Sequence, residues 1–359
     1  MIDKIEIKGY KSIKELSLRL NPVNILIGSN GVGKSNFISF FKFLNTIYEQ
    51  RLEQYSMKYG ADDILHFGRK TTSEIDAYIQ FDNTNGYSFI LNATNDNKLT
   101  ISSEYASFHR WRYGSGWKRE LISSNIKETK IKNSISAIAT HARTYLESFR
   151  VHHFHDTSEN APLRGFSDTN DNRLLRENGG NIASFLYYLQ EKHTTNFRRI
   201  EAAVQSIAPF FERFQLQPNR LNEQRIQLEW IEKNHPDKYF NATHLSDGTL
   251  RFIALATLLL QPEPPEVIII DEPELGLHPV AVNKLAGMLR SAAGKKKQVI
   301  ISTQSVGLVN NFTPEEIITV DRNGDESVFA RLESSELGQW LEDYSIGDLW
   351  SKSIIKGQP

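Results

Sequence analysis

A glycine-rich stretch, GSNGVGKS at residues 28–35, limits what this chain can fold into more than any other feature. The apolar run VNILI precedes it, and apolar side chains recur at helical spacing after it. The pattern GxxxxGKS between a buried strand and a helix is typical of a loop whose backbone N–H groups surround phosphates. We therefore predict an α/β fold with a phosphate site at the end of a strand.

Each residue type in this loop has an expected role. The glycines allow backbone N–H groups to turn inward, Lys34 reaches the β- and γ-phosphates, and the Ser35 hydroxyl ligates Mg²⁺. An ordinary glycine turn is the alternative, but the motif and its context agree on ATP and Mg²⁺ as cofactors. The expected nucleotide contacts are Ser29, Asn30, Gly31, Val32, Gly33, Lys34, Ser35 and Asn36.

A second buried strand, VIII at residues 267–270, ends in Asp271 and Glu272. An Asp in this place can hold the Mg²⁺ water shell, and the next carboxylate can orient the attacking water. Two solvated carboxylates before a turn are the alternative reading. We predict Glu272 as a catalytic residue and Asp271, with Ser35, as a metal ligand. His278, farther along this loop, either caps the next helix or lies near a nucleotide.

The segment LSDGTLR, residues 245–251, opens a strongly apolar helix upstream of that strand. Ser246, Asp247 and Gly248 there read either as a second phosphate-binding helix N-terminus or as the cap of a core helix. The position before Asp271 favours phosphate binding. Such a signature is useful only when it closes over a nucleotide held by another nucleotide-binding domain, so we expect a homodimer joined through ATP.

Three segments follow from the pattern of elements along the chain. Residues 1–104 form the N-terminal half of an ATPase core, with a β-meander predicted from the short strands broken by turns after residue 74. Residues 105–245 form an irregular and helical lobe, and residues 246–359 complete the core. Within the lobe, residues 105–133 read as irregular; the expected strands are 149–154 and 225–230, and the expected helices 180–193 and 196–213.

Composition narrows the class of protein. Lys+Arg total 42 against Asp+Glu 43, so net charge argues neither for nor against nucleic acid. The chain has no cysteine, and its apolar runs are far shorter than the roughly 20 residues of a membrane span. We expect a cytoplasmic protein away from the membrane. The absence of a sustained heptad pattern excludes a long coiled-coil arm.

Two weaker patterns can be interpreted either as ordinary structure or as a binding site. Bases alternate with aromatics in HRWRYGSGWKRE at 109–120, including Arg110, Arg112, Lys118 and Arg119. This stretch, with the lysines of 127–132, could contact nucleic acid, but a solvated loop is favoured. The run His152, His153, His155 and Asp156 suggests a metal cluster at first sight. Strand alternation separates His152 from the other two, which favours packing or hydrogen bonding.

The order of these motifs resembles ABC-type ATPases of the RecF/SMC branch. The opening IEIKGYKSIKELSLRLNPVNILIGSNGVGKS is similar to that branch's first strands. More narrowly, HFHDTS, LSDGTLRFIALATLLLQP, DEPELGLHP, STQS and WLEDYSIGDLW resemble a group of stand-alone bacterial ATPases, the AAA_21-type family. The resemblance implies a P-loop fold of ABC type with a mixed sheet and flanking helices. It also implies an ATP-sandwich dimer, in which Ser246 and Gly248 of each chain meet the γ-phosphate held by the other chain.

The chain departs from this pattern at Gln304, where ABC-type ATPases usually place a histidine. Glutamine can hydrogen-bond a phosphate but cannot take up a proton, so we predict a catalytic role with slow turnover. Gln80 is a candidate for the glutamine that links the two lobes. Tyr10 and Lys11 lie where this branch often contacts the base or phosphates, with core packing as the alternative for Tyr10.

The sequence thus favours an ATP-binding, slowly hydrolysing ATPase that acts as a switch, sensor or scaffold. The resemblance suggests anti-phage defence or DNA maintenance, with the damage done by a separately encoded effector, a nuclease or a toxin. A RecF-like DNA-binding repair ATPase is the first alternative. The cytoplasmic ATPase subunit of a membrane transporter is the second, and the RecF/SMC-like opening counts against it.

Overall fold

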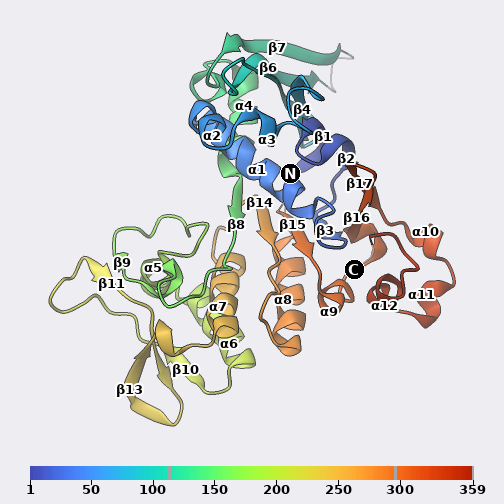
Figure 1. Cartoon of the computed structure of the whole chain (residues 1–359). Coiled ribbons are helices and arrows are strands. Elements are labelled where there is room, and N and C mark those ends of the chain that lie inside the picture. Colours follow the sequence, from blue (N-terminus) through green and yellow to red (C-terminus); the bar gives the residue numbers. More distant parts are fainter. Residues whose placement is uncertain (111–114, 295–296, 358–359) are drawn as a thin grey trace.

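A mixed sheet lies at the centre of the protein in a computed structural model that describes residues 1–110, 115–294 and 297–357 (Figure 1). Its strand order is β17-β16-β3-β15-β14-β8, and neighbouring strands run parallel except β17, which is antiparallel to β16. The strands are β3 (Val23–Ile27), β8 (Arg150–His152), β14 (Val267–Asp271), β15 (Gln298–Thr303), β16 (Ile317–Asn323) and β17 (Glu326–Arg331). The predicted α/β fold with a mixed sheet is confirmed.

Side chains of the central strands point alternately to the two faces of the sheet, so the interior consists of two hydrophobic cores. Ile268 and Ile270 of β14 pack in one cluster with α7 (Asp247–Leu260) and α8 (Pro279–Ala292). Val267 and Ile269 pack in another with the phenylalanines of α1 (Lys34–Tyr48). Because side chains of a strand point to opposite faces in turn, a continuous apolar run serves helices on both sides. The apolar strands of the sequence therefore mark a sheet covered on two faces.

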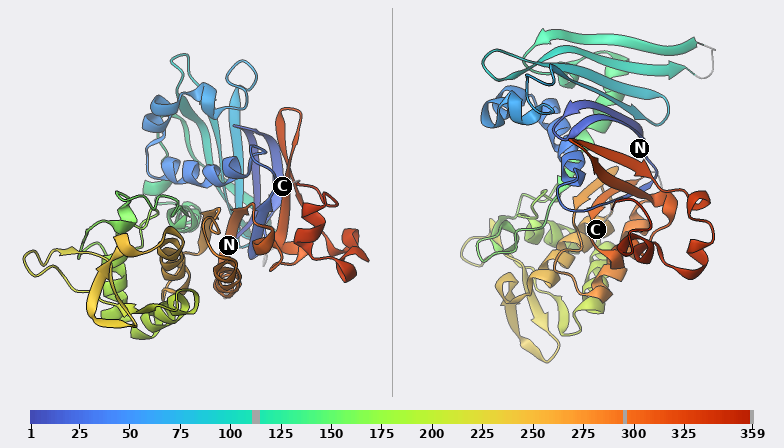
Figure 2. Two further views of the ribbon diagram at one scale, coloured as in Figure 1. Left: turned by 60° about the horizontal axis from the view of Figure 1, so that its bottom comes forward. Right: turned by 45° about the vertical axis from the view of Figure 1, so that its right-hand side comes forward.

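A second sheet lies on the far side of α1 (Figure 2). It is antiparallel, with the order β2-β1-β4-β5-β6-β7. Its strands are β1 (Ile2–Tyr10), β2 (Ile13–Arg19), β4 (Glu74–Phe81), β5 (Asn85–Ala93), β6 (Leu99–Arg110) and β7 (Ser115–Ile126). The helices α2 (Leu52–Tyr59), α3 (Ala61–Ile64) and α4 (Ala137–Ser148) accompany it.

The prediction that residues 105–133 are irregular is wrong. Most of the described residues there belong to the β6–β7 hairpin, in which Tyr105 pairs with Leu121 and the Arg119 guanidinium stacks on the Tyr105 ring at 3.6 Å. Polar side chains hide the strand pattern because this hairpin lies at the edge of an antiparallel sheet, where one face meets solvent. The division proposed at residue 104 passes through β6.

The lobe between β8 and α7 combines helices and short strands (Figure 1). It contains β9 (Ser167–Asp168), α5 (Ile182–Lys192), α6 (Thr194–Ile207), β10 (Phe211–Phe214), β11 (Arg225–Ile226), β12 (Glu229–Glu232) and β13 (His235–Asn241). The helix expected to reach residue 213 ends at Ile207 because Pro209 disfavours a helical conformation at the residue before it. The strand expected at 225–230 is divided between β11 and β12, and the one expected at 149–154 is limited to β8.

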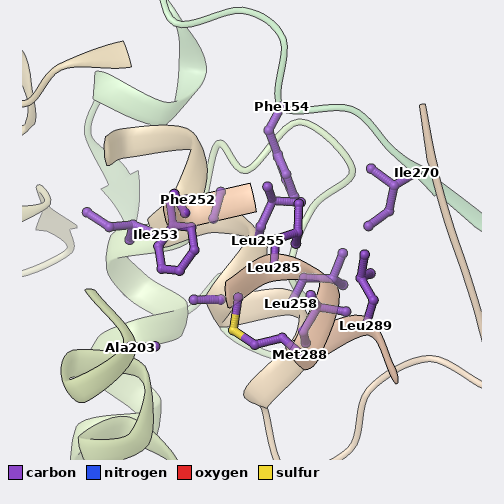
Figure 3. Close-up of a cluster of buried hydrophobic side chains, with 14 of the residues drawn as sticks. Phe154, Ala203, Phe252, Ile253, Leu255, Leu258, Ile270, Leu285, Met288 and Leu289 are labelled. Carbon is purple, nitrogen blue, oxygen red and sulfur yellow. The ribbon is translucent and has the colours of Figure 1, made fainter. Parts of the chain in front are cut away.

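The helices α7 and α8 pack against each other below the central sheet (Figure 3). Phe252, Leu255 and Leu258 of α7 lie in the same buried cluster as a row of side chains on α8. That row consists of Leu285, Met288 and Leu289. The close packing fixes the direction in which α7 begins, and this direction matters for the site described below.

Short helices complete the chain after β15. They are α9 (Val306–Val309), α10 (Ser334–Leu337), α11 (Trp340–Asp343) and α12 (Ile346–Ser351). Within the described ranges, no helix has the length and apolar character needed to cross a membrane. In the same ranges the longest helix is α1, with 15 residues, so the expected absence of a coiled-coil arm holds for them.

Removing the Phe252 ring should test the packing of α7. Phe252 is fully buried, so Phe252→Ala should lower the free energy of unfolding by about 3–5 kcal/mol, since it removes apolar burial and leaves a cavity. Urea unfolding followed by circular dichroism measures this. Val280→Ala is the control, because Val280 on α8 is 57% exposed and its loss should change the value by at most about 0.5 kcal/mol. Equal effects of the two substitutions would contradict this packing.

Candidate nucleotide-binding site

The glycine-rich loop joins β3 to α1 in a conformation that needs glycine. Gly31 and Gly33 have φ angles of 79° and 117°, in the region that side chains rarely adopt. A Cβ at Gly33 would collide with the Ser327 hydroxyl. Gly33 is also the N-cap of α1 and supplies no side-chain acceptor, so the first N–H groups of α1 remain for an anion.

The Lys34 side chain turns back into the loop. Its ammonium donates hydrogen bonds to the carbonyl oxygens of Gly28 at 2.5 Å and Ser29 at 2.9 Å. Burial lowers the pKa of Lys34, while the charges of Glu272, Asp271 and Glu274 oppose this shift. The ammonium therefore lies in the field of the acidic segment that follows β14, although more than 230 residues separate the two segments in sequence.

Two serines that the sequence did not single out brace this loop from outside. The Ser327 hydroxyl of β17 donates to the carbonyl of Val32 at 2.5 Å and lies 2.7 Å from the Ser12 hydroxyl. Asn36, expected to contact nucleotide, donates its side-chain amide to Ser12 at 2.7 Å. Ser35 lies exposed in the first turn of α1. No local motif marks Ser12 or Ser327, since their roles arise only where β2 and β17 meet the loop.

The acidic pair is positioned by the neighbouring strand β15. Asp271 lies opposite Ser302 and accepts a hydrogen bond from its hydroxyl, and the Glu272 N–H donates to the Ser302 carbonyl at 3.0 Å. Glu272 has φ 41°, an uncommon value for a residue with a side chain and one that often marks functional sites. The Gln304 amide donates to the Glu272 carboxylate. The structure thus brings the two predicted catalytic residues into direct contact.

Glu274 holds the start of the segment that carries Gln304. One of its carboxyl oxygens accepts from the Thr303 hydroxyl at 2.5 Å and from the Gln304 N–H at 3.1 Å. The other oxygen is buried with no hydrogen-bond partner among the described residues. Burial raises the pKa of this carboxyl, since the charged form loses its hydration. Glu274 therefore positions the Gln304 backbone.

His155 and Arg251 connect the acidic segment to the edge strand β8. The His155 Nε2 lies 2.9 Å from the Asp271 carbonyl. Arg251 of α7 donates to the carbonyls of Phe154 at 2.9 Å, His155 at 3.0 Å and Leu275. Arg251 is thus a structural hub that the sequence analysis missed. No sequence pattern marks Arg251 for this role, because every group that accepts its hydrogen bonds is a backbone carbonyl.

A metal role for the histidine run is not supported. His152 is buried, with its Nδ1 unpartnered, while His155 faces Asp271. The described residues contain no group of three or more His, Cys, Asp or Glu side chains placed to hold a metal ion. Ser35 and Asp271 as Mg²⁺ ligands stay a prediction, in which a hydroxyl and a carboxylate oxygen would hold the ion together with phosphates and water.

The signature segment forms the N-terminus of α7. Ser246 is its N-cap and accepts from the Thr249 N–H at 3.2 Å. Asp247 pairs with the buried Arg164 at 2.7 Å, and Arg164 also donates to backbone carbonyls, including that of Thr157 at 2.8 Å. Gly248 packs so closely on the loop after β14 that a Cβ would collide with the Gly276 carbonyl. Ser246 and Asp247 remain exposed.

The other residues that the sequence singled out lie in the core, in the antiparallel sheet or at the start of a helix. Tyr10 is fully buried between Phe40 and Phe43, which agrees with its core reading, and Lys11 donates to the Ser39 hydroxyl. Gln80 pairs in register with Lys4 and Gly86 in the antiparallel sheet. His278 is the N-cap of α8. Of the basic stretch, residues 111–114 and the Arg110 side chain lie outside the described residues; Lys118 and Arg119 belong to β7.

Comparison with known proteins agrees with this arrangement. The model of the AAA_21 family, described as "AAA domain, putative AbiEii toxin, Type IV TA system", matches residues 23–310, more than half of the chain. An Smc head crystallised with the C-terminal winged-helix domain of ScpA superposes with a TM-score of 0.64 at 17% identity over 94% of this chain and 99% of that one. An Smc head from Pyrococcus furiosus gives 0.58 at 15% identity, over 95% and 98%.

Curated relatives match a shorter segment. The energy-coupling factor transporter ATP-binding protein EcfA of Methanocaldococcus jannaschii is 37% identical over 78 residues, 22% of this chain and 27% of that protein. EcfA2 of Streptococcus agalactiae is 30% identical over 89 residues, 25% and 30%. The chain therefore spans less than a third of the length of these relatives.

Adding a methyl group at Gly248 should test the contact between α7 and the loop after β14. Gly248→Ala should lower the free energy of unfolding by about 1–3 kcal/mol, because the Cβ must displace the Gly276 carbonyl. Thermal unfolding in the absence of nucleotide measures this. Gly287→Ala on α8 is the matched control: nothing lies within 4 Å of its Cβ position, so it should stabilise by about 0.4–1 kcal/mol. Two shifts of the same sign would refute the close contact.

Proposed function

We propose that this chain, which belongs to the AAA_21 family and has the fold of an SMC-like, ABC-type ATPase, works as an ATP-driven switch whose closed form is a dimer. The observation that carries the proposal is the exposed N-terminus of α7. Ser246 and Asp247 lie at the surface, and α7 packs in a different core from α1, which follows the phosphate loop. A second chain is needed to bring a phosphate loop to this helix end.

In this proposal ATP is held from two directions. The free N–H groups at the start of α1 and the Lys34 ammonium bind its phosphates on one chain. On the other chain, Ser246 and the N–H of Gly248 meet the γ-phosphate through the positive end of the α7 dipole. Arg164 and Arg251 hold α7 rigidly, so that its N-terminus is preorganised for this contact.

Hydrolysis is assigned to the acidic segment. The Glu272 carboxylate orients the attacking water, and Ser35 and Asp271 hold Mg²⁺, which would neutralise charge on the phosphates. The Gln304 amide donates a hydrogen bond to the Glu272 carboxylate. In this proposal the hydrogen bond fixes the orientation of that carboxylate. The Gln304 amide does not change its protonation state, so it cannot act as a general acid or base. We therefore expect slow turnover.

A slow cycle suits a switch. A long-lived closed dimer presents a composite surface to a partner for as long as ATP remains intact, and hydrolysis resets it. We propose that the partner is a separately encoded effector, such as a nuclease or toxin, in bacterial defence or DNA maintenance. The family description, which names a toxin and a toxin–antitoxin system, supports this direction.

Mixing two defective variants should test the shared site. Lys34→Ala leaves the α7 signature intact, and Ser246→Arg leaves the phosphate loop intact. Each variant alone should lack ATPase activity, while the mixture should regain a measurable part of it, since a mixed dimer contains one complete site. Phosphate release measures this.

The matched control mixes Lys34→Ala with Glu272→Gln. Both substitutions damage the loop-and-acidic-segment half of the site, so every composite site in that mixture carries one of them. This mixture should stay inactive. Activity in the control, or none in the first mixture, would rule out a site shared between chains.

Substitutions of the acidic segment should separate ATP binding from turnover. Glu272→Gln should lower the turnover rate at least about a hundredfold while ATP-dependent dimers accumulate, as measured by size-exclusion chromatography with light scattering. Gln304→Ala should lower turnover about tenfold, because it removes a hydrogen bond to a charged group. Gln339→Ala, at an exposed position on the far C-terminal segment, is the control and should change neither. An unchanged rate in Gln304→Ala would refute its catalytic role.

A further inference from the structure

A second polar hollow lies at the outer edge of β8, apart from the phosphate loop. The segment at residues 171–178 runs beside β8, where the His153 N–H donates to the Glu177 carbonyl at 2.9 Å. Between them is an open cavity of about 840 Å³, and a smaller one of about 330 Å³ adjoins it. The two share Arg150, Leu174 and Leu175 in their walls, so they lie side by side and together make up the hollow at this edge.

The larger cavity gathers positive charge. Arg51, Arg150, Arg173 and Arg176 line it from separate parts of the chain. Of these, Arg176 pairs with Asp171 at 2.7 Å. The other three guanidinium groups have no hydrogen bond or ion pair with any described residue. Unpaired arginines that converge on one cavity are typical of a site for phosphate groups, which match the planar guanidinium donors.

The smaller cavity has a different character. Leu175 and Pro265 form apolar walls, and Leu174, although apolar, is 60% exposed at the junction of the two cavities. His152 lines this cavity, is 1% exposed, and has no hydrogen-bond partner for its Nδ1 among the described residues. Burial lowers the pKa of His152 to about 4, so the ring is neutral at physiological pH. The His152 ring thus adds a neutral face to the wall of the smaller cavity.

The shape and chemistry of the two cavities are complementary to one kind of molecule. A flat heterocycle would contact the leucine and proline walls of the smaller cavity, while an attached phosphate would reach the arginines. Carboxylates and an amide at the rim of the smaller cavity, from Glu147, Glu266 and Gln261, can accept from or donate to ring substituents. We propose that this hollow is a binding site for a nucleoside phosphate, distinct from the ATP site.

The site has a direct connection to the proposed catalytic segment. Arg150 and His152 belong to β8, and three residues beyond, His155 lies against the Asp271 carbonyl. Arg251 fixes the carbonyls between them. A ligand that moves β8 therefore acts on the backbone that carries Asp271. This regulatory consequence rests on the proposed ATPase function, whereas binding itself does not.

Nucleotide binding in a background without the ATP site tests the proposal. In Lys34→Ala protein, isothermal titration calorimetry with AMP, ADP, GMP and GDP should detect one equivalent of at least one nucleotide per chain. Adding Arg150→Ala and Arg173→Ala should weaken this binding at least about tenfold, because it removes charge-assisted hydrogen bonds to the phosphate. Arg199→Ala, an exposed arginine on α6, is the matched control and should leave the affinity unchanged.

A further variant separates the two halves of the ligand. Leu174→Ala removes part of the exposed apolar wall but no arginine, so it should weaken nucleotide binding while inorganic pyrophosphate binds as before. Circular dichroism and urea unfolding verify that each variant folds. Failure of all four nucleotides to bind overturns the proposal, as does binding that the arginine variants leave intact. Equal affinity for pyrophosphate and for nucleotides would show that the heterocycle makes no contact, which contradicts the proposed nucleoside site. Stronger, salt-dependent binding of an oligonucleotide assigns the hollow to nucleic acid instead.

Discussion

The parallel pairing of β3, β15 and β14 is the constraint on which the rest of the structure depends. Ser302 of β15 pairs with Asp271 of β14 on one side and with Leu26 of β3 on the other. The phosphate loop and the acidic segment therefore follow their strands at the same edge of the sheet. The two residues after Ser302 then reach Glu274 and Glu272. A shift by one residue would turn every side chain to the opposite face and separate these groups, so the apolar alternation of the strands also determines the site.

Buried arginines provide the second level of organisation. Arg251 and Arg164 are almost excluded from solvent, and carbonyl groups of three segments accept their hydrogen bonds: the stretch after β8, the stretch before α7 and the loop after β14. A buried guanidinium is tolerated only when its donors are satisfied, so these loops are held at a defined separation from α7. The N-terminus of α7 therefore has one orientation, which a shared nucleotide site requires.

The fold alone is shared with Smc heads at 15–17% identity, and a fold of this kind hosts many functions. What distinguishes this chain lies in particular residues. Gln304 binds Glu272 where a protonatable side chain is expected, and His155 contacts the Asp271 carbonyl at the end of β8. The β6–β7 hairpin extends the antiparallel sheet beyond the predicted meander. The contact between Gln304 and Glu272 carries the proposal on turnover, and the position of His155 links the edge of β8 to the acidic segment.

The sequence by itself determined the elements around the glycine loop and the strand before Asp271, because strong apolar periodicity and a glycine pattern are local properties. The alternation of strands and helices also indicated an α/β fold, whereas the mixed sheet was implied by the resemblance to ABC-type ATPases. Only the tertiary structure decided that Glu272 and Gln304 touch, that Arg164 and Arg251 support α7, and that Arg51, Arg150 and Arg173 line one cavity. These contacts join residues far apart in the chain, and their partners are often backbone carbonyls, which every residue possesses. No sequence pattern can mark them, because they exist only after the strands have paired and the helices have packed.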